Sequence, residues 1–296
     1  MKCSKCRNKA IISYPVRFCK EHFIEYYLRK IQRTIEKWKM FNNNDKILVA
    51  VSGGKDSSSL AYALHLLGYN FEGLYIDLEI PNYSSFCREK VTELFKLMGK
   101  KLNIINVSEY GVKVEPIKNK PVCSVCGTIK RYIMNKFAYE NGFTVIATAH
   151  TMPDEVAFFF MNIRSGNVQA ISKQKPVLEG YGKFVKKVKP SIYLTEKENL
   201  LFALVNNIPF CHLECPYSEN NPQSLFKFKL YDLEKEFKGI FNQTIKFVEK
   251  FNFTPEKEEL YECVSCGYPT SSKDKICSFC KIKDYFSKKY TNKVSY

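Results

Sequence analysis

The sequence predicts an α/β fold, a doubly wound parallel sheet with a small metal-binding module at each end. Short β-branched segments alternate with helical segments through the middle of the chain, and a glycine-containing turn joins the first of these strands to a helix. Cysteine pairs gather near both termini. Because helices cover both faces of such a sheet, we expect ligands beyond the carboxyl ends of its strands.

Length and composition agree with a globular protein. The 296 residues suggest one mid-sized domain with attachments, and 45% hydrophobic residues provide for a sizeable core. A net charge of +16 favours a polyanionic partner, usually nucleic acid, although lysines on a solvated surface give the same balance. The sequence has no apolar run of membrane-spanning length and does not begin with the apolar stretch of a signal peptide, so we expect a cytoplasmic protein without membrane association.

Two sets of metal-ligand residues stand near the two ends of the chain. In each set, two pairs of ligands are separated by a longer spacer, which is typical of a structural zinc ion in closed tetrahedral coordination. A cytosolic chain also keeps its thiols reduced, which argues against disulfides. We predict one Zn²⁺ site at each end, held by Cys3, Cys6, Cys19 and His22 and by Cys263, Cys266, Cys277 and Cys280.

The chain divides into five predicted parts. Residues 1–26 form an N-terminal zinc finger, 27–45 a basic linker helix and 46–220 the α/β domain. Residues 221–257 form a C-terminal helical segment and 258–296 a zinc ribbon.

Periodicity predicts the individual elements. The linker helix has an apolar stripe with basic residues off it, a face that is either solvated or lies along a phosphate backbone. Further on, apolar residues from Leu230 to Val248 recur at helical spacing and predict one helix. The strands are expected at residues 47–51, 71–78, 102–107, 143–149 and 183–188, with helices between them.

The turn after the first strand has the character of a phosphate-binding loop. Glycines let backbone amides approach an anion, the following helix presents its positive end, and serine and lysine add donors. Val49 and Asp56 break the Walker A pattern. The residues of this loop are Ser52, Gly53, Gly54, Lys55, Asp56 and Ser57.

Three further cysteines form a second candidate site. Cys123 and Cys126 precede a predicted helix, and Cys215 follows some ninety residues later. Three thiolates leave one position open, as in catalytic zinc or in a [4Fe-4S] cluster with one iron not bound by protein. Redox-active or sulfur-carrying thiols and purely structural cysteines remain alternatives on spacing alone.

The order of these motifs resembles a known family. Ser-Gly-Gly-Lys-Asp-Ser after a strand resembles the PP-loop of the ATP pyrophosphatases, which have a Rossmann-like sheet and split ATP into AMP and pyrophosphate. The later motifs and the paired zinc sites make the chain similar to the TtuA and TtcA type tRNA 2-thiolation enzymes, above all the TtuA branch. These motifs are C-x2-C-G-x2-K-R from Cys123, His-x3-Asp-Glu from His150, and Cys-Pro-Tyr from Cys215.

The resemblance implies an ATP-dependent tRNA uridine 2-sulfurtransferase. ATP would adenylate the C2 oxygen of a uridine, and sulfur held on the free iron of a [4Fe-4S] cluster would replace that oxygen. Lys55 and the loop amides would stabilise the leaving pyrophosphate. By position, Cys123, Cys126 and Cys215 would bind the cluster.

Other roles follow by position in the same way. Lys130 and Asp154 match the catalytic lysine and aspartate, and Asp56 would help to hold Mg²⁺. Asp154 could also bind Mg²⁺ or orient the nucleotide, although helix capping by Asp154 is the simpler structural explanation. Ile76 at the end of the second strand lies where the fold places adenine and ribose.

Partners follow from the family as well. A homodimer is usual, and the sulfur donor would be a ubiquitin-like protein thiocarboxylate or free sulfide. The chain departs from the family by lacking one carboxylate before Asp154 and by reading Arg-Ser-Gly-Asn at residues 164–167.

Two alternative functions remain. They are a PP-loop thiolase that uses a cysteine persulfide without a cluster, and a non-catalytic zinc-rich RNA-binding protein with a nucleotide site. The modified uridine, at position 54 or 34, stays open.

Overall fold

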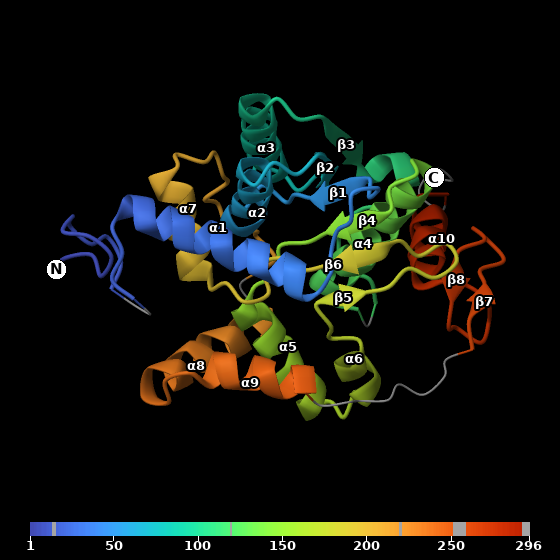
Figure 1. The fold of residues 1–296 in the computed structure, drawn as a ribbon. Helices are drawn as coiled ribbons and strands as arrows, with labels where there is room; N and C mark the ends of the chain where they lie inside the picture. The colour runs from blue at the N-terminus through green and yellow to red at the C-terminus, as the bar shows by residue number, and fades with distance from the viewer. Residues whose placement is uncertain (14–15, 119, 219–220, 251–258, 292–296) are drawn as a thin grey trace.

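A twisted, mostly parallel sheet forms the centre of the protein in the computed structural model, which describes residues 1–13, 16–118, 120–218, 221–250 and 259–291 (Figure 1). Its strand order is β3-β2-β1-β4-β6-β5, and every neighbouring pair is parallel except β5 with β6. The strands are β1 Ile47–Ala50, β2 Phe71–Asp77, β3 Leu102–Asn106, β4 Val145–Ala147, β5 Val177–Leu178 and β6 Lys186–Val188.

The predicted fold class is confirmed. Each of the five predicted strands contains an observed one, although β4 keeps only the central three residues of its predicted range and β6 only the last three. The two-residue strand β5 was not predicted, since its pairing with β6 depends on a loop rather than on its own sequence. The chain runs from β1 outward through β2 to β3 and then returns to β4 on the other side of β1. The order in which strands are added therefore reverses between β1 and β4.

Helices cover both faces of the sheet. The helices are α1 Lys20–Lys37, α2 Lys55–Leu66, α3 Ser84–Met98, α4 Val122–Glu140, α5 Met152–Arg164, α6 Val168–Ser172, α7 Glu196–Val205, α8 Pro222–Glu236, α9 Ile240–Lys250 and α10 Ser278–Thr291, with the 3₁₀ helix η1 Val107–Tyr110 after β3. A small hairpin of β7 Tyr261–Glu262 and β8 Pro269–Thr270 precedes α10.

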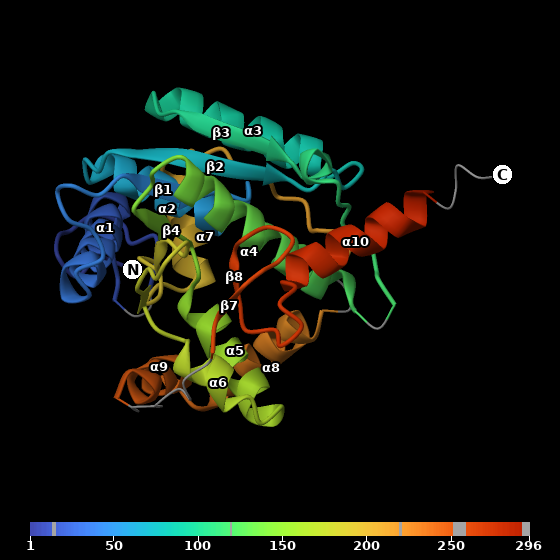
Figure 2. The ribbon, with the colours of Figure 1, turned by 90° about the vertical axis from the view of Figure 1, so that its right-hand side faces the viewer.

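Alternation along β1 divides the core into two layers. Ile47 and Val49 face a cluster that includes α1, α2, α3 and α7, whereas Leu48 faces a cluster of α4, α10 and the C-terminal cysteines. Side chains alternate across a strand, so each face needs its own apolar cover. Figure 2 shows α4 against the sheet with α10 packed beside it.

Helix α1 confirms the predicted amphipathic helix, and two lysines of its basic face form ion pairs within the chain. Tyr27 and Ile31 are fully buried. Lys30 pairs with Glu198 at 2.8 Å and Lys37 pairs with Glu249 at 2.9 Å. These two lysines therefore tie α1 to other parts of the chain.

The single C-terminal helix predicted from the apolar spacing is wrong, because the structure has two. Helix α8 ends at Glu236, and Gly239 adopts the left-handed backbone with φ of 95° before α9 begins. Glycine tolerates this conformation, which breaks the helix without breaking the apolar pattern. The two helices pack against α5 through a third apolar cluster that includes Val156, Leu230 and Phe241.

The predicted part boundaries remain predictions. Helix α1 is continuous across the boundary between residues 26 and 27. The boundaries after residues 220 and 257 fall on segments 219–220 and 251–258, outside the described residues. Among the described helices, none is both long and apolar enough to cross a bilayer.

Candidate functional site

The candidate phosphate loop and the segment that carries Asp154 lie at neighbouring strand ends. The loop follows β1, and residues 148–151 lead from β4 into α5. Strands β1 and β4 pair directly, with Val49 opposite Ala147. The point where a doubly wound sheet reverses is where its crevice opens, so these two segments share the expected ligand position.

The loop has a conformation that requires glycine at one position. Gly53 has φ of 86°, and a Cβ there would come within 2.9 Å of the Cys87 Cβ. Within the loop, the Ser52 amide donates to the Ser57 hydroxyl at 3.1 Å, and that hydroxyl donates to the Gly54 carbonyl at 3.1 Å. Helix α2 begins at Lys55, directly after the turn, so its free amides face the space an anion would occupy.

Lys55 and Asp56 form the charged part of the loop. Lys55 Nζ lies 3.0 Å from Asp56 Oδ2 and 3.6 Å from Glu196 Oε2. Burial opposes its charge, but these two carboxylates raise the pKa of Lys55. For Asp56, burial raises the pKa despite Lys55 and the Asn199 amide, which donates to Asp56 Oδ1 at 2.8 Å. A phosphate bound at the loop would therefore meet a charged Lys55 ammonium that already contacts carboxylate oxygens.

Asp154 has two sets of partners. Its Oδ2 accepts from the Thr151 amide at 3.1 Å and hydroxyl at 2.7 Å, so it caps α5 as the structural explanation requires. Its Oδ1 accepts from Lys227 Nζ of α8 at 2.9 Å. Burial raises the pKa of Asp154, but Lys227 and Thr151 outweigh burial and lower it. Helix capping therefore engages only Oδ2 of this charged carboxylate, and Oδ1 contacts another helix.

The three candidate cluster cysteines lie on two segments that are in contact. Cys123 and Cys126 lie in the first two turns of α4 rather than ahead of the helix, which begins directly after the N-cap Pro121 with φ of −59°. Cys123 Sγ donates to the Tyr217 carbonyl at 3.5 Å, which puts the Cys215 loop against this turn. Burial first, and then the neighbouring Cys215 and Cys123 thiols, raise the pKa of Cys126, while Lys130 opposes this.

The cysteine segment is joined to the phosphate loop. The Cys211 amide donates to the Gly53 carbonyl at 2.7 Å, and Cys211 forms a parallel bridge with Gly54. Cys87 is fully buried, packs beneath Gly53 and interacts with the Cys211 thiol. Four residues after this bridge the chain reaches Cys215. The sulfur-bearing segment thus begins as an extension of the loop.

The remaining predicted residues lie around this centre. Lys130 is exposed on α4, one turn after Cys126, and the side chain of Ile76 is half-buried at the end of β2. Next to Ile76, Asp77 is buried and lies 3.6 Å from Arg88.

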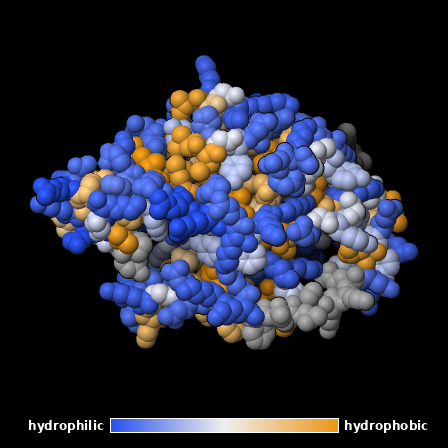
Figure 3. Space-filling model, in the orientation of Figure 1, coloured by the Kyte–Doolittle hydropathy of each residue, from blue (hydrophilic) through white to orange (hydrophobic). Residues whose placement is uncertain are grey.

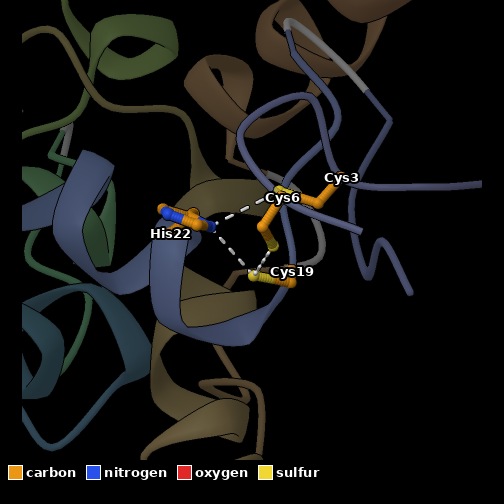
Figure 4. A group of neighbouring side chains, drawn as sticks. All are labelled: Cys3, Cys6, Cys19 and His22. Atoms are coloured by element: carbon orange, nitrogen blue, oxygen red, sulfur yellow. Dashed lines mark hydrogen bonds between the residues drawn. The ribbon is translucent and has the colours of Figure 1, made fainter. Parts of the chain in front are cut away.

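Both terminal ligand sets have the dimensions of a zinc site. In each, the four ligand atoms lie within 4.8 Å of one another, and they are the sets of three or more ligands that meet this limit among the described residues. Zinc–sulfur bonds of about 2.3 Å place two tetrahedral thiolates just under about 4 Å apart. Cys6 and Cys19 are separated by 3.7 Å, and Cys19 Sγ lies 3.2 Å from His22 Nδ1 (Figure 4). The donor sets therefore fit Zn²⁺.

The C-terminal set also has amides that favour thiolates. The Cys277 amide donates to Cys263 Sγ at 3.2 Å. Burial raises the pKa of Cys263, but this and neighbouring amides lower it to about 6. The module packs on α4, where the ring of Phe279 stacks on Tyr132 with centroids 3.8 Å apart. It therefore supports the helix that carries Cys123 and Cys126.

Sequence reasoning missed three residues of this site. Asn199 and Glu196 come from α7 and contact the loop, from which they are distant in sequence. Lys227 comes from α8 and contacts Asp154. The Thr-x2-Glu capping signature at Thr195 could have located the start of α7. Nothing in the sequence around Lys227 distinguishes it from the other lysines of α8.

Comparisons with known proteins show the family of the chain. The model of the PP-loop domain family matches residues 25–182. The tRNA-5-methyluridine(54) 2-sulfurtransferase of Pyrococcus horikoshii is 43% identical over 95% of this chain and 93% of its own length. The enzyme of the same name from Thermotoga maritima is 38% identical over 98% of both. Among solved structures, the U34-tRNA thiolase NcsA from Methanococcus maripaludis with its [4Fe-4S] cluster matches with a TM-score of 0.84, 26% identity and 96% coverage of both chains.

Proposed function

Because this chain belongs to the PP-loop family of tRNA 2-thiolation enzymes, we propose that its phosphate loop and its three central cysteines form one tRNA-thiolating active site. The enzyme is a tRNA sulfurtransferase that uses ATP to replace a uridine C2 oxygen by sulfur. One observation carries the proposal: the Cys211 amide is bonded to the Gly53 carbonyl at 2.7 Å, so the segment leading to Cys215 is attached to the loop.

The loop would activate the base. Lys55 and the first amides of α2 would hold the phosphates of ATP, and their positive charge would stabilise the leaving pyrophosphate while the uridine oxygen attacks the α-phosphate. Asp56, supported by Asn199, would help to hold Mg²⁺. Ile76 would line the nucleotide at the end of β2. Asp154 and Lys130 would act beside the base, Asp154 as the oriented carboxylate and Lys130 as a cation near the developing charge.

The cysteines would supply the sulfur site. Cys123, Cys126 and Cys215 would hold a [4Fe-4S] cluster, and three thiolates would leave one iron without a protein ligand. The contact between Cys123 and the Tyr217 carbonyl supports this set, because it holds the Cys215 segment against the start of α4. Such a cluster, when bound, supplies an iron to which sulfide can attach for transfer to C2, with AMP as the leaving group. The first turn of α4 would also favour the negative charge of three thiolates through its dipole.

The substrate and partners follow from the family. We propose position 54 as the target, because relatives at 38–43% identity are named for that position whereas the U34 thiolase is 26% identical. The largely hydrophilic surface in Figure 3, on a chain of net charge +16, suits tRNA phosphates. Sulfur would come from a ubiquitin-like protein thiocarboxylate or free sulfide, in the cytoplasm where tRNA is modified.

A homodimer is part of the proposal. Helix α8 and the turn after it expose three large apolar side chains, each more than 60% accessible, which a second copy could cover. They are Leu225, Phe228 and Phe237.

Nucleoside mass spectrometry on tRNA from a deletion strain tests the function. We expect loss of the 2-thio group from 5-methyluridine at position 54, with the wobble nucleosides unchanged, and recovery when the gene is returned. Loss of 2-thiouridine at position 34 alone would contradict the assigned position but keep the reaction. Unchanged 2-thiouridines at both positions would overturn the function.

Loss of the C-terminal zinc should weaken the whole site. We expect Cys277→Ser to reduce bound zinc from two ions to one per chain and to cost about 4 kcal/mol or more of unfolding free energy, as loss of a structural metal commonly does. Elemental analysis and denaturant unfolding measure both effects. The exposed Ser265 lies between the ligands Cys263 and Cys266, so Ser265→Ala should keep the zinc and serves as the control. Equal zinc content in the two variants would rule out this site.

A further inference from the structure

A chain of alternating charges links the phosphate loop to Asp154. Lys227 Nζ from α8 contacts Asp154 Oδ1 of α5 at 2.9 Å and also bonds to Glu196, the first residue of α7. Glu196 in turn reaches Lys55 Nζ at 3.6 Å. Two ammonium groups thus share one carboxylate, and each also contacts a carboxylate of its own.

This arrangement places Lys227 at the junction of three helices. The side chains of Lys227, Asp154 and Glu196 are between 22% and 24% exposed, so their charges are only partly screened by water. A lysine side chain loses considerable rotamer freedom when it is held between two acceptors. The two acceptors therefore hold the Lys227 ammonium in one position.

Helix α8 is also held against α5 by apolar packing. Leu230 is buried against α5 in the cluster with Val156 and Phe241, independently of Lys227. Ion pairs of this kind often contribute no more stability than apolar residues of similar size. The stability of α8 therefore does not by itself account for the two ion pairs of Lys227 with Asp154 and Glu196.

We propose that Lys227 is a positioning residue of the ATP site, which holds Asp154 and Glu196 in place beside Lys55. This inference rests on the proposed function, because it gives Asp154 a task in activating the base. Thr151 binds one oxygen of Asp154, and Lys227 fixes the other.

Kinetic parameters separate this positioning role from direct nucleotide binding. Loss of a contact made equally to bound ATP and to the transition state raises KM, whereas loss of an interaction made only in the transition state lowers kcat. Small displacements of a reacting group are costly, so we expect Lys227→Met to lower kcat for tRNA-dependent pyrophosphate release about 10- to 100-fold, with KM for ATP changed less than about threefold.

Two further variants complete the kinetic test. Lys227→Arg keeps a cation with several donors and should recover most of kcat. Lys229→Met removes an exposed lysine of the same helix that lies over the Phe228 ring, and it should behave as wild type. Steady-state kinetics on the full-length protein with ATP and tRNA supply both parameters.

A second measurement does not depend on activity. Hydrogen exchange at the start of α5, over residues 151–155, should become faster in Lys227→Met and stay unchanged in Lys229→Met. Unchanged exchange in Lys227→Met, an unchanged kcat, or a rise in KM alone would each overturn the role of Lys227. A wild-type protein that releases no pyrophosphate with tRNA would instead count against the proposed function itself.

Discussion

The Cys215→Ser variant is expected to lose its iron–sulfur absorbance and its tRNA 2-thiolation, whereas Cys211→Ser keeps both. Cys215 lies near Cys126 on the segment that contacts Cys123 through Tyr217. Loss of residues that merely support metal ligands already costs about 10- to 100-fold, so removal of a ligand should lower the rate by more than about 100-fold.

Cys211 is the matched control because it is the nearest rival ligand in sequence. Its thiol is buried beside Cys87, and its amide is engaged by the Gly53 carbonyl. Both variants would be purified without oxygen and compared by iron and sulfide content, by visible absorption and by nucleoside mass spectrometry of the product. Cluster loss in Cys211→Ser with retention in Cys215→Ser would reverse the assignment. Full thiolation by Cys215→Ser without iron would favour the persulfide alternative.

Gly53→Ala is expected to destabilise the protein and abolish ATP binding. The left-handed backbone at φ of 86° costs an alanine about 1–2 kcal/mol. Its Cβ would also stand 2.9 Å from the Cys87 Cβ and 3.0 Å from the Cys87 carbonyl, and such overpacking costs about 1–3 kcal/mol more. Moving the loop away from α3 would remove these close contacts, but it would also displace the amides that would face phosphate.

Gly54→Ala provides the control one residue later. Gly54 has φ of −74°, and a Cβ there would meet only Ser52 Oγ at 3.7 Å, an ordinary contact. Denaturant unfolding should therefore show near wild-type stability for Gly54→Ala and a large loss for Gly53→Ala. Calorimetric titration with ATP would show whether Gly53→Ala still binds nucleotide. Equal stability of the two variants would mean that the loop can relax without cost.

Local patterns predicted most of the scaffold. The strand, the turn and the helix around residues 47–66 follow from β-branched residues, glycines and a helical apolar stripe, all of which act within a few residues. The zinc sets could be predicted because their ligands are close in sequence and their spacing reflects one coordination geometry. The break between α8 and α9 was missed because one glycine interrupts the backbone while the apolar spacing continues across it.

The site itself was only partly predictable. A motif order common to a family identified Cys123, Cys126, Lys130, Asp154 and Cys215, yet spacing alone left their chemistry open.

What the sequence by itself determined is the set of local elements, the phosphate loop and the ligand spacing, because each depends on interactions within a short stretch of chain. What only the tertiary structure decided is the charge network of Lys55, Glu196, Lys227 and Asp154, and the bond that ties Cys211 to Gly53. These groups come from separate helices and loops. They meet because the sheet brings neighbouring strand ends together and apolar packing holds α8 against α5.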